Sequence, residues 1–154
     1  MILNNLKFTK IQFGTDLYKK LLDFRFNILR VPLKLEWSEE DLKNEDKQYH
    51  FAVFLNKEII GCCVLKKLSQ TKIKLRQMAV SENFRGNSIG SYIIKMAEIF
   101  CIENGYSEIV LTARCYAVNF YKKNGFSSFG DVFLDVTLES IMMKKVLNDK
   151  YRIS

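Results

Sequence analysis

The chain has 154 residues, 48% of them hydrophobic, and its 24 Lys and Arg against 17 Asp and Glu give a formal net charge of +7. This apolar content, together with a single proline, excludes an intrinsically disordered chain, a collagen-like repeat and a proline-rich linker protein. A chain of this length buries roughly 70% of its unfolded surface. We therefore expect one domain over residues 1–154.

The first half of the chain predicts a strand, two helices and three consecutive strands. Residues 6–13 have a strand pattern, and Thr15 is the expected N-cap of a helix that Pro32 ends. Ser38 begins a capping-box pattern that predicts a second, short helix. The next three strands are expected at residues 50–55, 59–67 and 72–80.

The second half predicts a polar turn, a long helix and three more strands. The helix follows the turn at 81–87 and ends near Gly105, which suits a C-terminal cap. A strand at 107–112, a short helix at 116–124 and strands near 126–134 and 138–147 complete the chain. This order predicts an α+β or α/β sandwich around one mixed sheet.

Neither a membrane span nor a secretion signal is predicted. The longest apolar run, residues 59–65, is far shorter than the roughly 20 residues that a span needs. The N-terminus lacks the basic-then-apolar order of a signal peptide, so we expect a cytoplasmic protein with free thiols. Cys62, Cys63, Cys101 and Cys115 form no CxxC pair and His50 is the only histidine, so we expect no metal.

The turn before the long helix has residues that suit an anionic ligand. The first N–H groups of a helix lack intrahelical acceptors and carry a partial positive charge. Gly86 and Gly90 allow a ligand to approach the backbone, Ser88 is small, and Arg85 adds a full charge. The turn has neither a Walker loop nor G-x-G-x-x-G, so these residues alone are equally compatible with an ordinary strand-to-helix turn.

Two segments carry a family resemblance. KLRQMAVSENFRGNSIGSYIIKMAE resembles the acetyl-CoA-binding motif of the GCN5-related N-acetyltransferases, whose Q/R-x-x-G-x-G/A pattern falls on residues 85–90. Ser88 stands where the family usually has Gly. ARCYAVNFYKKNGF is similar to the family's later A-x-x-F-Y-x-x-x-G-F segment, and the outer parts of residues 25–147 resemble a small bacterial subgroup of unassigned acetyltransferases.

The resemblance implies a fold, a reaction and a set of binding residues. The fold would be the acyl-CoA N-acyltransferase fold, an α+β (α/β/α) sandwich with a mixed, mostly antiparallel sheet. The reaction would be transfer of acetyl from acetyl-CoA to a primary amine, by direct attack in a ternary complex. The cofactor-binding residues it implies are Met78, Ala79, Val80, Arg85, Gly86, Asn87, Ser88, Ile89, Gly90, Ser91 and Asn119.

Tyr121 is the catalytic residue that the resemblance favours. A phenol with an ordinary pKa near 10 stays protonated at pH 7 and can donate its proton to the departing thiolate. The alternative role for Tyr121 is core packing with Phe120 and Phe126.

The acceptor side is less defined in the sequence. An amine with a pKa near 10.4 is neutral in only about one molecule in 2,500 at pH 7, so the site must desolvate it or take its proton. His50, Glu45 and Asp46 are candidate acceptor-binding residues. The alternatives are a structural histidine at a strand end and a solvated helix end.

Two other functions stay open at this point. A non-catalytic acyl-CoA sensor is compatible with Ser88 and with the absence of an identifiable base. A nucleic-acid-binding protein would suit the positive charge, but no recognisable RNA-binding sequence interleaves aromatic residues with Lys and Arg. We expect an amine acceptor, small or peptidic, and neither nucleic acid nor membrane as partner. A homodimer through the last strands is compatible with the pattern.

Overall fold

The computed structural model describes residues 2–148 and has the predicted order of elements, β-α-α-β-β-β-α-β-α-β-β. The strands are β1 (Leu6–Ile11), β2 (Tyr49–Leu55), β3 (Glu58–Lys67), β4 (Lys72–Val80), β5 (Glu108–Arg114), β6 (Ser127–Asp135) and β7 (Leu138–Val146). The helices are α1 (Asp16–Leu29), α2 (Glu39–Leu42), α3 (Ile89–Glu103) and α4 (Val118–Lys123). Of the helices within residues 2–148, none has the length and apolar character needed to cross a membrane.

The strands form a mixed sheet in the order β1-β2-β3-β4-β5-β7-β6. The pairs β1–β2, β2–β3, β5–β7 and β6–β7 are antiparallel, whereas β4 and β5 are parallel and are joined through α3. A parallel pair needs such a crossover, which explains why the long helix lies between these two strands. The predicted α+β class with a mostly antiparallel sheet is confirmed.

The chain divides into two compact units, each made of two chain segments. The first unit comprises the chain up to Lys66 together with Gln77–Met96. The second comprises Lys67–Arg76 together with the chain from Ala97 onward. Strand β4 and helix α3 therefore each contribute residues to both units.

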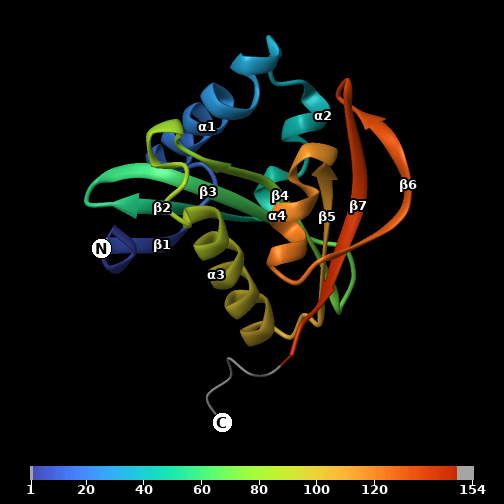
Figure 1. The fold of residues 1–154 in the computed structure, drawn as a ribbon. Coiled ribbons are helices and arrows are strands. Elements are labelled where there is room, and N and C mark those ends of the chain that lie inside the picture. Colours follow the sequence, from blue (N-terminus) through green and yellow to red (C-terminus); the bar gives the residue numbers. More distant parts are fainter. Residues whose placement is uncertain (1, 149–154) are drawn as a thin grey trace. The chain divides into compact units, whose positions relative to one another are not determined.

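In the first unit, α1 covers one face of the strands (Figure 1). Thr15 is its N-cap, as predicted, and its hydroxyl accepts a hydrogen bond from the N–H of Tyr18. Tyr18, Leu21 and Arg25 form the buried stripe of the helix, whereas Leu17 is 43% exposed. The core that the helix covers comprises Ile11, Tyr18, Leu21, Ala52, Cys62 and Ala79.

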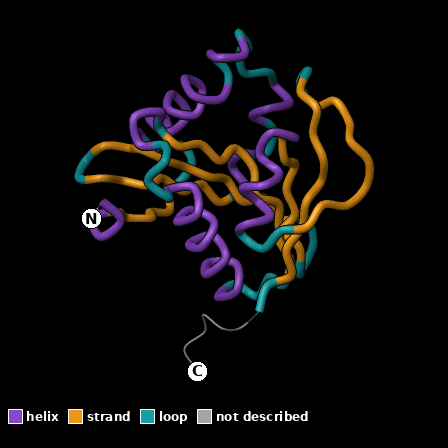
Figure 2. The backbone as a smooth tube through the Cα atoms, in the orientation of Figure 1, coloured by secondary structure: helices purple, strands orange, loops and turns teal. Residues whose placement is uncertain are grey.

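In the second unit, β5 is the buried strand and β6 is the exposed one. The β6–β7 hairpin bows apart where its register shifts between Phe129 and Phe133 (Figure 2). Gly130 lies inside this irregular stretch with φ +74°, as expected of a bulge that needs a left-handed residue. The hairpin turns through Val136 and Thr137, which both have positive φ despite their branched side chains.

Candidate active site

The turn between β4 and α3 lies in the first unit and is held by local hydrogen bonds. The N–H of Arg85 donates to the carbonyl of Glu82 at 3.3 Å, and the Nε of Arg85 donates to the carbonyl of Val80 at 3.4 Å. The Nδ2 of Asn87 donates to the carbonyl of Phe84 at 3.2 Å. The two side chains thus support the turn rather than only facing solvent.

The backbone of this turn leaves room for a ligand. Gly86 has φ +82°, and a Cβ atom built on it would meet no atom within 4 Å. Ser88 has φ +63°, the left-handed conformation that glycine adopts without strain, so a serine there costs about 1–2 kcal/mol. Residues 85–88 are exposed, while Ile89 is buried and anchors the first turn of α3. The N–H groups at the start of α3 can therefore be reached from solvent by an anion.

Helix α3 approaches β3 closely just after this turn. At Gly61 in β3, a Cβ atom would lie 3.0 Å from the Cδ1 atom of Ile93. A larger residue at position 61 would force the Ile93 side chain to move, so this glycine allows α3 to pack closely against β3.

Strand β4 is irregular in the segment that precedes the turn. Gln77 has φ +53°, so the strand's alternation is interrupted there, and Ala79 beyond it is buried in the core under α1. The carbonyl of Gln77 accepts a hydrogen bond from the Sγ of Cys62 at 3.4 Å. The side-chain Oε1 of Gln77 is also buried, and it has no hydrogen-bond partner among the residues that the structure describes. Met78 and Val80 are half-buried.

Cys62 gives the first testable prediction. Burial raises the pKa of its thiol to about 12, so the thiol stays protonated and remains a donor to Gln77. We expect Cys62→Ala to lower the free energy of unfolding by about 1 kcal/mol more than Cys101→Ala, because only the former removes the thiol donor of the half-buried Gln77 carbonyl. Both thiols are fully buried, so the two truncations empty a similar volume. Equal losses in urea denaturation would contradict the assignment.

Four polar residues of the first unit form a buried polar cluster, namely Tyr18, Arg25, Glu45 and His50. Arg25 donates from Nη1 to the Oε1 of Glu45 at 2.7 Å, and Tyr18 donates its hydroxyl to the same oxygen at 2.9 Å. The Nε2 of His50 lies 2.7 Å from the backbone carbonyl of Glu45, so Nε2 carries the proton and donates. The cluster ties α1 and β2 to the short 3-10 helix Glu45–Lys47 between them.

This cluster changes the interpretation of the predicted acceptor-binding residues. Glu45 and His50 do come together, but the Glu45 carboxylate is already neutralised by Arg25, so it offers little attraction to an amine. Asp46 is exposed and separate from that pair. Sequence reasoning missed Arg25, although a charged residue one turn after Leu21 on the apolar stripe of α1 was a visible signal.

Tyr121 and Asn119 belong to the second unit, on α4. The Tyr121 ring makes edge-to-face contacts with Phe120 and Phe126, with ring centroids 5.1 Å and 5.9 Å away. Burial raises the pKa of Tyr121 to about 12, and the charge of Arg114 opposes that rise. The half-buried ring therefore packs against two aromatic neighbours while its phenol keeps the proton that an acid needs. Asn119 is exposed.

Arg114, at the end of β5, holds the β6–β7 turn. Its Nη1 donates to the backbone carbonyl of Asp135 at 2.7 Å, to a carboxylate oxygen of Asp135 at 3.0 Å and to the Oγ of Ser140 at 3.1 Å. Ser140 is fully buried. The sequence did not single out Arg114, because these partners follow it by more than 20 residues.

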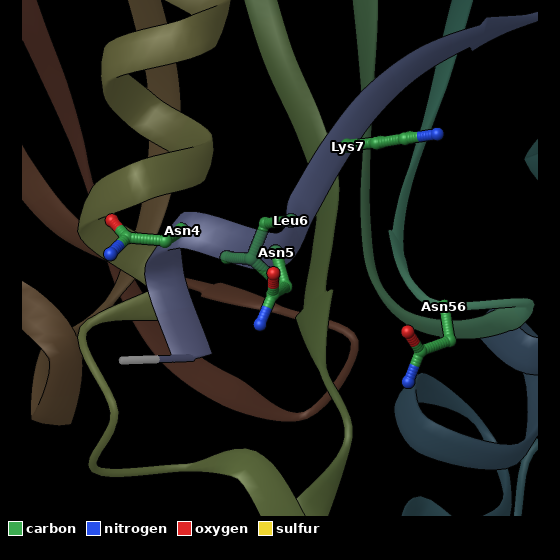
Figure 3. A pocket seen from close by; sticks show the side chains of 5 residues that line it. All are labelled: Asn4, Asn5, Leu6, Lys7 and Asn56. Carbon is green, nitrogen blue, oxygen red and sulfur yellow. The ribbon is translucent and has the colours of Figure 1, made fainter.

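A small pocket also opens at the start of β1, beside the turn between β2 and β3 (Figure 3). Its lining residues are Asn4, Asn5, Leu6, Lys7 and Asn56. None of the predicted site residues lines it. Across residues 2–148, no three His, Cys, Asp or Glu side chains are grouped so that they could hold a metal ion.

Two relatives found by sequence comparison are also named N-acetyltransferases. The chain is 27% identical over 117 residues to the uncharacterised N-acetyltransferase YitI of Bacillus subtilis, which covers 72% of this chain and 78% of that protein. It is 28% identical over 107 residues to the uncharacterised N-acetyltransferase YjcF of the same organism, covering 69% of this chain and 74% of the relative.

Solved structures share the fold at low sequence identity. Escherichia coli ElaA has a TM-score of 0.80 at 18% identity, and the match covers 91% of this chain and 99% of that one. A putative N-acetyltransferase from Lactobacillus plantarum has a TM-score of 0.85 at 16% identity, covering 94% and 100%. A GNAT family acetyltransferase from Elizabethkingia anophelis, solved with acetyl-CoA bound, has a TM-score of 0.65 at 18% identity, covering 94% and 99%.

The family model described as the acetyltransferase (GNAT) family matches residues 12–126, which span α1 to α4 and include the turn, the β4 irregularity and Tyr121. The protein is a member of the GNAT acetyltransferase family.

Proposed function

We propose that this acetyltransferase passes an acetyl group from acetyl-CoA directly to a primary amine while both substrates are bound. The observation that carries the proposal is the turn at 85–88, which is exposed, has two left-handed residues and leaves the Cβ position of Gly86 empty. Such a turn lets the diphosphate of coenzyme A approach the N–H groups at the start of α3.

Each predicted binding residue has a role in this proposal. Arg85 adds positive charge at the turn, Asn87 supports its shape through Phe84, and the N–H groups from Ser88 to Ser91 bind the diphosphate. The backbone of Met78–Val80 pairs with the pantetheine arm as a strand would, and Asn119 contacts the same arm. These roles follow from the family resemblance together with the conformation of the turn.

The chemical step needs a neutral amine and a proton for the leaving group. The amine nitrogen attacks the thioester carbonyl, a backbone N–H near Met78–Val80 stabilises the oxyanion, and the sulfur leaves as a thiolate. Tyr121 donates the proton that this thiolate takes, since its phenol stays protonated at neutral pH. We propose no single side chain as the base, because water can remove the proton of the amine.

The acceptor is an amine of a small molecule or a peptide, and we place the reaction in the cytoplasm. A homodimer through the last strands is supported by the exposed apolar side chains of β6, among them Val132 and Leu134 at 56% and 72% exposure. Sedimentation at micromolar concentration tests that association.

Acetyl-CoA binding is tested by Gly86→Ala, with Gly14→Ala as the matched control. Both glycines have φ near +80°, and a Cβ atom on either would meet no protein atom within 4 Å. Both substitutions should therefore destabilise the fold by a similar amount, about 1–2 kcal/mol. Only Gly86→Ala should weaken acetyl-CoA binding in calorimetry, about tenfold or more, because its methyl group would stand between the backbone and the diphosphate.

Assays on the same purified wild-type protein distinguish the two rival functions from the proposed one. Release of free thiol with any member of an amine panel supports an enzyme, whereas acetyl-CoA binding without release for every amine supports a sensor. Salt-sensitive binding of nucleic acid without acetyl-CoA affinity would support the nucleic-acid rival. Equal acetyl-CoA affinities for Gly86→Ala and Gly14→Ala would overturn the assignment of the turn.

A further inference from the structure

Gln77 combines two unfavourable features in one residue. Its backbone is left-handed, with φ +53°, in the middle of a strand where an ordinary residue would be extended. Its side-chain Oε1 is buried, and the described residues offer it no hydrogen-bond partner. Buried acceptors are almost always satisfied, so such a pair of features at one residue calls for a ligand or a functional reason.

The surrounding residues do not direct a donor at this oxygen. The thiol of Cys62 donates to the backbone carbonyl of Gln77 and not to its side chain. The terminal nitrogens of the two buried arginines in the first unit are engaged, and their buried Nε atoms reach no acceptor among the described residues, the Oε1 of Gln77 included. The terminal nitrogens of Arg25 bond to Glu45, and Nη2 of Arg30 bonds to Asp41. The amide oxygen of Gln77 is therefore a buried acceptor for which the described residues supply no donor.

The place of Gln77 in the strand indicates which donor that is. It directly precedes Met78–Val80, the segment that under the proposed function lies beside the pantetheine arm. The left-handed residue interrupts the alternation of β4 at that point, so the Gln77 side chain is displaced from the regular pattern of the strand. A group held by this side chain would lie next to the thioester end of the donor rather than in the sheet.

We propose that the Oε1 of Gln77 accepts a hydrogen bond from an N–H of the attacking amine. This inference rests on the proposed function and adds an acceptor-binding residue to it. A neutral amine keeps one lone pair for attack and has N–H groups to spare, so one N–H bonded to Oε1 would fix the direction of that lone pair. A carboxylate in the same position would instead favour the charged ammonium, which cannot attack.

In the step that this contact serves, the nitrogen lone pair forms the C–N bond and the C–S bond breaks. The sulfur leaves with the bonding electrons and takes a proton, and the nitrogen loses one proton to water. The N–H that Gln77 holds stays on the nitrogen and becomes the N–H of the product amide. The contact therefore persists through the reaction, and a stable amide can report it.

The test uses two coenzyme A derivatives that differ in one group. One carries S-CH2-C(O)-NH-propyl on its sulfur and the other carries S-CH2-C(O)-O-propyl, which lacks the N–H. Calorimetry on the wild-type protein should give a ratio of ester to amide Kd about tenfold larger than on Gln77→Met, in which the amide oxygen is lost. Gln77→Glu keeps an oxygen acceptor and should retain a preference for the amide.

The outcomes separate the inference from the proposed function. If unmodified coenzyme A fails to bind, the proposed function fails. If coenzyme A binds but the wild-type protein does not prefer the amide over the ester, the inference is wrong, whether or not Gln77→Met folds. A buried water that merely satisfies Oε1 would make Gln77→Met change the melting temperature while leaving the preference intact, and this too would overturn the inference.

Discussion

Arg25→Met is expected to lower the free energy of unfolding by about 3–5 kcal/mol, measured by urea denaturation. Arg25 is fully buried on α1, and its guanidinium is the cation beside the equally buried carboxylate of Glu45. Removing the arginine leaves that carboxylate without a counter-charge in a medium that solvates it poorly. Methionine fills a similar volume, so the loss reports the uncompensated charge rather than a cavity.

A pair of the same unit with a partly exposed carboxylate, Arg30 and Asp41, supplies the control. Arg30 bonds to Asp41 at 2.7 Å, but the Asp41 side chain is 22% exposed, so water can solvate it when its partner is removed. Arg30→Met should therefore cost clearly less than Arg25→Met. Adding Glu45→Gln to Arg25→Met should recover part of the loss, since it removes the stranded charge. A loss below about 1 kcal/mol for Arg25→Met would show that the pair is not desolvated as described.

Tyr121→Phe is expected to lower kcat about 100-fold or more while leaving the acetyl-CoA affinity nearly unchanged. The ring contacts with Phe120 and Phe126 need no hydroxyl, so phenylalanine keeps the packing and removes only the hydroxyl that we propose as the acid. Thiol release with an active amine measures kcat, and calorimetry measures the affinity. Tyr116→Phe removes a hydroxyl from a residue that is 83% exposed and should leave both quantities unchanged.

The pH dependence follows from the direction of the Tyr121 shift. Its pKa is raised to about 12 mainly by burial, so the phenol is protonated throughout the range from about pH 6 to 10. The deficit of Tyr121→Phe should therefore be constant over that range. Between about pH 10 and 12 the folded protein binds the proton more tightly than the unfolded chain, so this residue's stabilising contribution is lost as the pH rises. Turnover that is unaffected by Tyr121→Phe at every pH would remove Tyr121 from the mechanism.

Local signals in the sequence predicted the order of elements and most of their ends. Thr15 and Ser38 both cap the helices they were expected to begin, because a cap depends only on the residues next to it. The apolar spacing of α3 likewise predicted a buried helix with Gly105 at its end, and that glycine has φ +86°. These features were readable because each is decided within a few residues along the chain.

The features that were not predicted depend on partners far apart in the sequence. Arg25 and Glu45 are 20 residues apart, and Gln77 and Cys62 are 15 apart, so no local pattern links them. Gln77 also carries no local sign of a left-handed backbone, since glutamine rarely adopts it. For the same reason Glu45 was expected to face an amine or solvent, when its actual partner lies on α1.

The division of β4 and α3 between the two compact units has a consequence for how such a protein can be cut or recombined. The chain passes from one unit to the other three times, after Lys66, Arg76 and Met96. No single break in the gene can therefore yield either unit as a continuous fragment. Exchanging one unit between two homologous genes would therefore need several joined crossovers rather than the swap of one terminal segment.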